Sequence, residues 1–265
     1  MKQKILTHLP TDHPWADRIL TFDTIDSTNT YAKTLASQGA PEGTVVLADR
    51  QTGGRGRMGR SFHSPGGQGI YFSVILRPRC HATQLMHLTC ATAVAMCEAV
   101  EAACGIRPGI KWTNDLVWQK HKLGGILTEL SLLPDGTVGY AVVGIGINCT
   151  QQQRDFPPEI QNIATSLSMI LDKEVSRCEV IGAMITALET MSRDLLTRKE
   201  QTMDAYKRNC ITLGQQVSIL QGESVFYGTA RDIGQDGGLI VETETGQLET
   251  VCAGEVSVRG MYGYI

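Results

Sequence analysis

The segment Gly53–Arg60 reads GGRGRMGR, with four glycines, three arginines and no acidic residue. Glycine weakens both helices and strands, and only Met58 in this stretch is apolar, so we expect an exposed loop. Guanidinium groups and glycine amides together bind carboxylates and phosphates. The segment therefore predicts a cationic loop with an anionic partner.

The glycines of this loop also match a nucleotide-binding spacing. Gly54, Gly56 and Gly59 fit the pattern G-x-G-x-x-G, which in dinucleotide-binding folds opens a helix. The arginines between them and the following SFHSPGG, which is not helical in character, argue against that fold. A solvated surface loop and an RGG-like RNA-binding segment are the other interpretations.

Two further segments place charged groups beside short apolar runs. Lys111, Asn114 and Asp115 lie within KWTND, and a lysine, an amide and a carboxylate together could bind a phosphate with Mg²⁺. Lys122 precedes two glycines in HKLGGIL, where another group could approach the backbone closely. An ordinary turn and a surface lysine at a strand start explain the same residues equally well.

Two other segments suit a neutral or flat ligand. Ser27, Thr28 and Asn29 lie at the start of a helix-like run, where their polar groups could bind a neutral ligand or cap the helix. Gly144 and Gly146 alternate in GIGIN, so they share one face of a strand and leave room there. Simple helix capping and close packing against a helix are the alternatives.

Composition excludes several classes of protein. The 265 residues carry a net charge of -3 and are 42% hydrophobic, which indicates a globular protein with a sizeable core. Mild acidity argues against general nucleic-acid binding, and the lack of a long apolar run argues against a membrane protein. The eight cysteines form no C-x-x-C pair and no export signal is evident, so we expect a reducing, cytoplasmic location.

Apolar periodicity predicts a series of helices and strands. We expect strands at 43–49 and 69–76, two short strands joined by a turn at Asn114-Asp115 within 110–118, and a hairpin over 122–149. Helices are expected within 24–37, after Ser27 and Thr28, and at 83–103, 177–198 and 203–209. Cys90, Cys97 and Cys104 are expected on one face of a buried helix, and His81 and His87 as a solvated pair at its start.

The pattern changes near Gly214. Beyond Leu213 the chain holds short strands divided by glycine turns, which predicts a small β-barrel of the SH3 type. We therefore expect two domains, at residues 1–213 and 214–265.

Five motifs taken in order carry a family resemblance. DSTN, QTGGRGRMGR, KWTNDL, KLGGILTE and GIGIN resemble the successive signatures of the biotin–protein ligases over residues 22–150. The ending GEVSVRG is similar to that of the family's SH3-like domain. The implied fold is α/β (α+β), a class II synthetase-like catalytic domain with a mixed sheet flanked by helices, followed by the small barrel. Met58 and Thr113 depart from the family, which often has a basic residue and a proline there.

The resemblance implies a two-step ligase. Biotin and ATP, with Mg²⁺, would give biotinyl-5′-AMP, and a lysine of a biotin carboxyl carrier domain, such as that of acetyl-CoA carboxylase, would then accept the biotin. The short segment before DSTN resembles the ligase-only form without an N-terminal DNA-binding domain. The family also allows a homodimer, while no nucleic acid or membrane partner is expected.

The resemblance assigns roles to individual residues of this sequence. The catalytic residues implied are Lys122, Arg57 and Arg55. The biotin-binding residues implied are Ser27, Thr28, Gln51, Gly54, Arg55, Arg57, Lys122, Gly125, Gly144 and Ile147. The ATP-binding residues implied are Arg57, Lys111, Asn114, Asp115, Lys122 and Asn148, with Asp115 as the Mg²⁺ ligand.

Two alternatives remain at this point. A lipoate–protein ligase shares the fold and the adenylate chemistry but usually lacks the glycine–arginine loop. A non-enzymatic RNA-binding protein would use the loop in a different way, although net acidity and the lack of interleaved aromatic and basic residues count against it.

Overall fold

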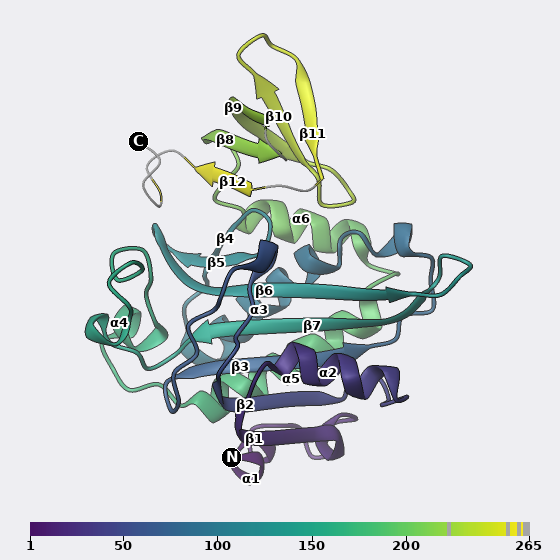
Figure 1. Cartoon of the computed structure of the whole chain (residues 1–265), viewed down its shortest axis with the longest axis vertical. Helices are drawn as coiled ribbons and strands as arrows, with labels where there is room; N and C mark the ends of the chain where they lie inside the picture. Colours follow the sequence, from purple (N-terminus) through teal and green to yellow (C-terminus); the bar gives the residue numbers. More distant parts are fainter. Residues whose placement is uncertain (222–223, 253–254, 259–260, 262–265) are drawn as a thin grey trace.

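A seven-stranded mixed sheet forms the framework of the larger part of the chain (Figure 1), in the order β1-β2-β3-β7-β6-β5-β4. The computed structural model describes residues 1–221, 224–252, 255–258 and 261. β1 pairs with β2 in parallel, and the other neighbours pair antiparallel. The strands are β1 (Ile19–Ile25), β2 (Val45–Gln51), β3 (Gly69–Leu76), β4 (Gly109–Lys111), β5 (Asp115–Trp118), β6 (His121–Leu132) and β7 (Val138–Asn148). The expected mixed sheet is therefore confirmed.

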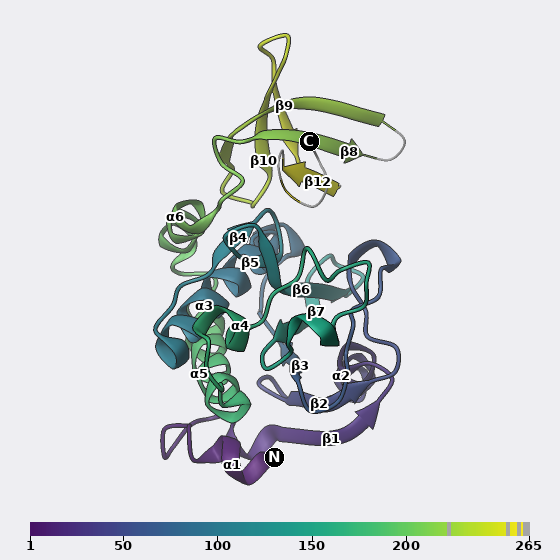
Figure 2. The same ribbon diagram turned by 90° about the vertical axis from the view of Figure 1, so that its left-hand side faces the viewer.

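Helices cover both faces of this sheet (Figure 2). On one face α2 (Thr28–Ser37) packs Ala32 and Ala36 against Val46, Ile75 and Val142 of the strands. On the other face lie α3 (Leu88–Cys104) and α5 (Arg177–Asp194). Strand β3 is buried along its whole length because it lies under helices on both sides.

Helix α3 is long and strongly apolar. The segment Ala82–Cys104 is long and apolar enough to cross a membrane, but 72% of its most apolar window is buried inside the protein. As expected, Cys90 and Cys97 are buried; Cys104 is half-buried. A large buried surface between the sheet and α5 explains the apolar composition.

His87 corrects one expectation. It is fully buried rather than solvated, and its Nε2 lies 2.9 Å from the carbonyl oxygen of Leu195. The chain just after α5 covers this end of α3, and burial lowers the pKa of the imidazole. Of the two histidines, only His81 is exposed.

The remaining elements of the larger part are short. Asp135 caps the β6–β7 turn by accepting from the amide of Thr137 at 2.9 Å, and Gly136 has a φ of +81°, which suits glycine. The expected hairpin is confirmed. The other helices are α1 (Lys2–Leu6), α4 (Leu167–Leu171) and α6 (Lys199–Asn209), the last of which begins four residues earlier than expected.

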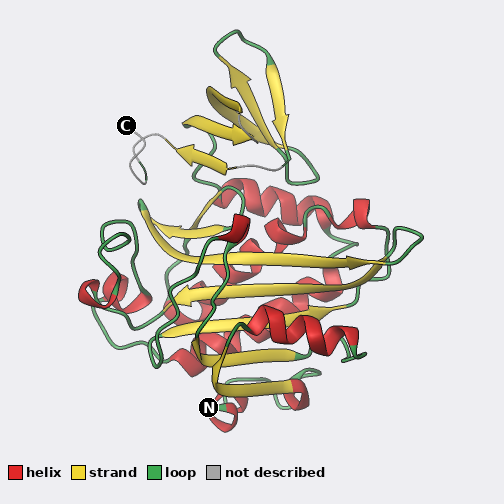
Figure 3. Cartoon of the chain, in the orientation of Figure 1, coloured by secondary structure: helices red, strands yellow, loops and turns green. Residues whose placement is uncertain are grey.

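The C-terminal part consists of strands (Figure 3) that form a five-stranded antiparallel sheet in the order β11-β10-β9-β8-β12. Its strands are β8 (Gln216–Gln221), β9 (Ser224–Ile233), β10 (Leu239–Thr243), β11 (Leu248–Val251) and β12 (Glu255–Val258). The expected small β domain is confirmed. GEVSVRG is described only over 255–258, and the boundary near Gly214 stays an interpretation.

Two hydrogen bonds fix the small domain to the β4–β5 hairpin. The indole of Trp112 donates to the carbonyl of Gly237, and the ammonium of Lys111 donates to that of Val256, each at 2.8 Å. Both donors are buried. Because an unmade buried hydrogen bond is costly, these contacts hold β12 beside the strands of the large sheet.

Candidate active site

A cavity lies on the α2 face of the large sheet, bounded by the start of α2, the glycine–arginine loop, the β4–β5 turn, β6, β7 and β12. It gathers predicted residues that are far apart in the sequence. Those in its wall are Ser27, Thr28, Gln51, Arg55, Arg57, Lys111, Asn114, Asp115, Lys122, Gly125 and Gly144.

One end of the cavity is neutral and polar. Ser27 caps α2, and the amide of Thr28 donates to Gln51 Oε1 at 2.8 Å. Gln51 in turn donates from Nε2 to Ser64 Oγ at 3.0 Å. Ser27 and Thr28 are almost fully buried. This end therefore offers fixed hydroxyl and amide groups to an uncharged ligand that can both donate and accept hydrogen bonds.

The alternate glycines of β7 hold side chains of the protein itself. A β-carbon on Gly144 would overlap the amide of Asn29, and one on Gly146 would overlap the ring of Phe62. The sequence predicted open room for a flat ligand at this place. The structure shows that the room above these glycines is taken first by Asn29 and Phe62, which then form part of the cavity wall.

If the ligand is biotin, as the sequence resemblance implies, Gly144→Ala should weaken its binding by about tenfold, since overpacking a tight site typically costs about 1–3 kcal/mol. The added methyl group would push Asn29 away from β7 and so displace the start of α2, which presents Thr28. Titration calorimetry with biotin would measure the change. Gly139→Ala is the matched control on the same strand, because a β-carbon there meets its neighbours only at 3.4 Å or more. Unchanged affinity in Gly144→Ala would contradict the expectation.

The glycine–arginine loop is folded back on itself rather than extended. The amide of Gly56 donates to the carbonyl of Arg60 at 2.7 Å, and that of Phe62 donates to Gly54 at 2.9 Å. At its tip, Met58 and Gly59 adopt positive φ values of +53° and +74°. The loop is thus a short hairpin that borders the cavity.

Arg57 ties this hairpin to the other side of the cavity. Its Nη1 donates to Asn114 Oδ1 at 2.8 Å, in the turn between β4 and β5. Asn114 is itself held because its Nδ2 donates to the carbonyl of Ile126 at 2.9 Å. Arg57 therefore spans the cavity from the loop to a fixed acceptor.

The opposite end of the cavity is cationic. Lys122 Nζ forms an ion pair with Asp115 Oδ1 at 2.7 Å, and the two side chains are 34% and 15% exposed. Gly125 lies beside this pair, since a β-carbon there would sit 3.5 Å from both partners. An anion that arrives here meets the ammonium group of Lys122 on β6, which Asp115 on the adjacent strand β5 already holds in place.

Three residues that the resemblance assigned lie outside the cavity wall. Ile147 is fully buried in the core on the face covered by α3 and α5, because strand alternation turns it away from the face of Gly146. Asn148 donates from Nδ2 to the carbonyl of Thr165 at 3.0 Å and so braces the end of β7. Gly54 is packed tightly, since a β-carbon there would lie 2.5 Å from the carbonyl oxygen of Phe62.

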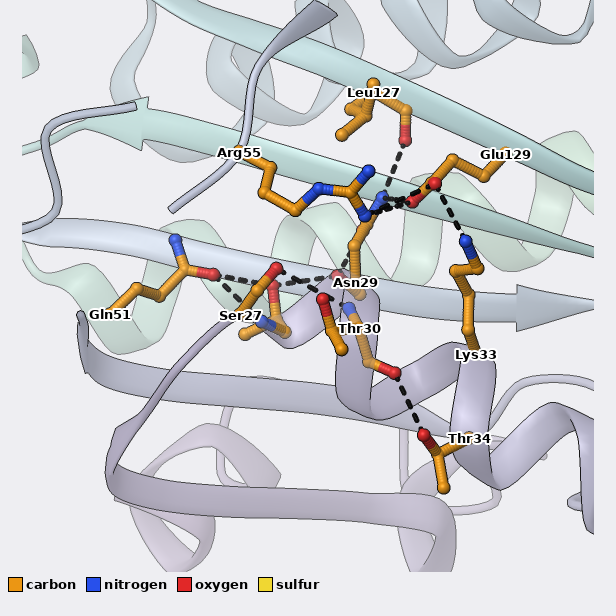
Figure 4. A network of polar contacts seen from close by, with 11 residues as sticks. Ser27, Asn29, Thr30, Lys33, Thr34, Gln51, Arg55, Leu127 and Glu129 are labelled. Carbon is orange, nitrogen blue, oxygen red and sulfur yellow. Dashed lines mark hydrogen bonds and ion pairs between the residues drawn. The ribbon is translucent and has the colours of Figure 1, made fainter. Parts of the chain in front are cut away.

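Other residues of the site escaped the sequence analysis. Glu129 lies inside the KLGGILTE motif but was given no role, because its pairing with Asn29 at 3.1 Å joins positions a hundred residues apart. Arg55 and Lys33 pair with the same carboxylate (Figure 4). Val256 reaches the cavity from the small domain, and nothing in the local sequence signals it.

Among the described residues that line the cavity, Asp115 is the one acidic side chain available to a magnesium ion. Among the described residues, no group of three or more His, Cys, Asp or Glu side chains is placed to hold a metal. The carboxylate of Asp115 fits an ion that is carried by phosphates, since Mg²⁺ is usually bound through one or two carboxylates together with substrate phosphates and water.

Comparisons with known proteins agree with this arrangement. The model of the biotin/lipoate A/B protein ligase family matches residues 21–148, and that of the biotin protein ligase C-terminal domain matches 212–259. The bifunctional ligase/repressor BirA of Bacillus subtilis is 39% identical over 84% of this chain and 69% of its own. A biotin–[acetyl-CoA-carboxylase] ligase of Mycobacterium tuberculosis is 30% identical over 87% of this chain and 85% of its own. A biotin protein ligase of Aquifex aeolicus, solved in complex with biotin and ATP, is 31% identical with a TM-score of 0.76, covering 91% of this chain and 98% of that one.

Proposed function

Because the chain belongs to the biotin protein ligase family, we propose that its cavity activates biotin with ATP to biotinyl-5′-AMP and then passes biotin to a lysine of a biotin carboxyl carrier domain. The observation that carries this proposal is the polarity of the cavity. A neutral end with Ser27, Thr28 and Gln51 suits the ureido ring, and a cationic end with Lys122 suits a carboxylate and a phosphate.

The first step joins two anions, and the cationic end of the cavity makes this feasible. A carboxylate oxygen of biotin attacks the α-phosphorus of ATP, and the bond to the β-phosphate oxygen breaks to release pyrophosphate. Lys122 and Arg57 reduce the repulsion between the anions and stabilise the negative charge that accumulates during attack. Magnesium enters with ATP as part of the substrate, and Asp115 supplies the carboxylate that can face it.

The second step needs the adenylate to survive until a carrier arrives. The lysine amine of the carrier attacks the acyl carbon, an amide forms, AMP leaves and the amine gives up a proton. A mixed anhydride hydrolyses in water, so the folded loop that Arg57 holds over the cavity protects it.

The alternatives are less well supported. The relatives from Mycobacterium and Aquifex are biotin ligases, which disfavours a lipoate ligase. Arg55, Arg57 and Arg60 line the cavity, and this favours a small-ligand role over RNA binding. A homodimer, a cytoplasmic location and the absence of nucleic-acid and membrane partners stay predictions.

The test of this proposal is direct. The chain is incubated with biotin, MgATP and a biotin carboxyl carrier domain, and the product is probed with streptavidin. We expect labelling of the carrier on one lysine, with pyrophosphate release that depends on biotin and not on lipoate. Pyrophosphate release that depends on lipoate, or on neither acid, would reject the proposal.

A further inference from the structure

One carboxylate beside the cavity joins the glycine–arginine loop to the ligand-facing end of α2. Glu129 on β6 is 19% exposed and accepts from Lys33 Nζ at 3.0 Å and from Asn29 Nδ2 at 3.1 Å. Arg55 Nη1 lies 3.2 and 3.3 Å from its two oxygens. Figure 4 shows these groups converging on Glu129 from the loop and from α2.

Asn29 extends the contact toward the neutral end of the cavity. Its amide is buried, with Nδ2 donating to Glu129 and to the carbonyl of Leu127, and Oδ1 accepting from Ser73 Oγ at 2.6 Å. Ser73 Oγ is also 2.8 Å from Thr28 Oγ1. The Asn29 amide is therefore fixed on both sides and has no freedom to turn.

The charge of Glu129 directs Arg55 to a different partner from that of Arg57. Burial would raise the pKa of the Glu129 carboxyl, but hydrogen bonds from Lys33 and Asn29 and the nearby Arg55 charge hold it below its usual value. The group is thus an anion at neutral pH. Its pairing turns the Arg55 guanidinium to β6, whereas Arg57 reaches the β4–β5 turn.

We propose that Glu129 is a positioning residue that anchors the first limb of the loop through Arg55 and so slows escape of the adenylate. This inference rests on the proposed function of the cavity. The loop would then be held at two points, by Arg55 on β6 and by Arg57 on the β4–β5 turn. Losing one attachment leaves the loop in place but lets it open more often.

A purely structural role for Glu129 makes a different prediction. If the carboxylate only fastened α2 to β6, Lys33 would matter as much as Arg55, because both pair with it at similar distances. If it anchors the loop, only Arg55 should affect retention of the adenylate. The two cations around one carboxylate therefore provide a matched comparison.

The experiment uses the full chain in the variants Glu129→Gln, Arg55→Met, their double variant, Arg55→Lys and Lys33→Met. Glutamine keeps one oxygen that can accept from Asn29, while it removes the charge and replaces the other oxygen with an amide donor. Each protein is loaded with labelled biotin and MgATP, and loss of biotinyl-adenylate is followed after a chase with excess unlabelled biotin. Thermal unfolding is recorded in parallel.

We expect Glu129→Gln and Arg55→Met each to speed loss of the adenylate about fivefold, the upper range for a partly exposed ion pair. The double variant should be no faster than the singles, because both remove the same contact. Lys33→Met should change the rate by less than about twofold, and Arg55→Lys should retain most of the anchoring.

The results that overturn the anchor are equally specific. Equal effects of Lys33→Met and Arg55→Met, additive effects in the double variant, or wild-type release from Glu129→Gln would each reject it. If the wild-type chain forms no adenylate at all, the proposed function itself fails, which is a separate outcome.

Discussion

Lys122→Ala should lower biotin-dependent pyrophosphate formation by about a hundredfold, the usual effect of losing one preorganised donor to a developing charge. The ammonium of Lys122 is held by Asp115 at 2.7 Å on the cavity wall, so it needs little rearrangement to meet an incoming phosphate. Because its attraction grows as negative charge gathers in the transition state, the loss should appear in kcat rather than in the KM for biotin.

The control and the measurement for Lys122 are simple. Lys120→Ala removes an exposed ammonium two residues away and should leave the rate within about twofold of wild type, as surface charges usually do. Single-turnover formation of pyrophosphate from ATP, with and without biotin, isolates the chemical step. A wild-type rate in Lys122→Ala would exclude its role in adenylate formation.

Local patterns predicted much of this fold and site. Alternation and apolar periodicity located most of the strands and the main helices, although strand β1 (Ile19–Ile25) was not predicted. The cap at Ser27 followed from a hydroxyl before a helical run. The motif residues meet in the cavity because strands distant in sequence, such as β2 and β6, belong to one sheet and carry these residues on the same face of it.

What escaped prediction depends on three-dimensional neighbours. Glu129 meets Arg55 and Asn29 only because β6 lies beside β7 and under the start of α2. Ile147 was assigned to the ligand because of its motif. Strand alternation from Gly146, however, turns its side chain to the face of the sheet that α3 and α5 cover. Val256 lines the cavity because the small C-terminal sheet packs against the β4–β5 hairpin. No local sequence pattern in the large domain predicts this contact.

Arg57→Gly should convert the protein from a selective ligase into one that releases biotinyl-adenylate. Arg57 is the loop residue that reaches Asn114 at 2.8 Å, and the glycine adds backbone freedom to a segment already rich in glycine. The closed loop therefore loses a charge-assisted hydrogen bond and costs more entropy to form.

The effect should fall mainly on dissociation of the adenylate. Chemistry continues at a reduced rate, since Lys122 remains, but interface losses usually appear in the rate of release. Each tenfold increase in that rate corresponds to a loss of about 1.4 kcal/mol in the free energy that keeps the loop closed. We expect the rate of release to rise by about ten- to a hundredfold. The free mixed anhydride then acylates exposed lysines on any nearby protein.

Two variants separate the possible causes of this behaviour. Arg57→Met removes the guanidinium without adding a glycine, so it should release less adenylate than Arg57→Gly but more than wild type. Arg79→Gly makes the same exchange in an exposed loop elsewhere, between β3 and α3, and should behave like wild type. Together they distinguish loss of the anchor from loss of backbone rigidity.

Streptavidin detection of an irrelevant lysine-rich protein, mixed with each variant, biotin and MgATP, measures the release directly. Labelling of this bystander should be strong with Arg57→Gly, weaker with Arg57→Met and near background with wild type and Arg79→Gly. The carrier domain should still be biotinylated in every case, which shows that adenylate is being made. If Arg57→Gly stays active on the carrier yet leaves the bystander unlabelled, then the hydrogen bond to Asn114 does not hold the loop closed, and protection of the adenylate must come from the Arg55 side of the hairpin.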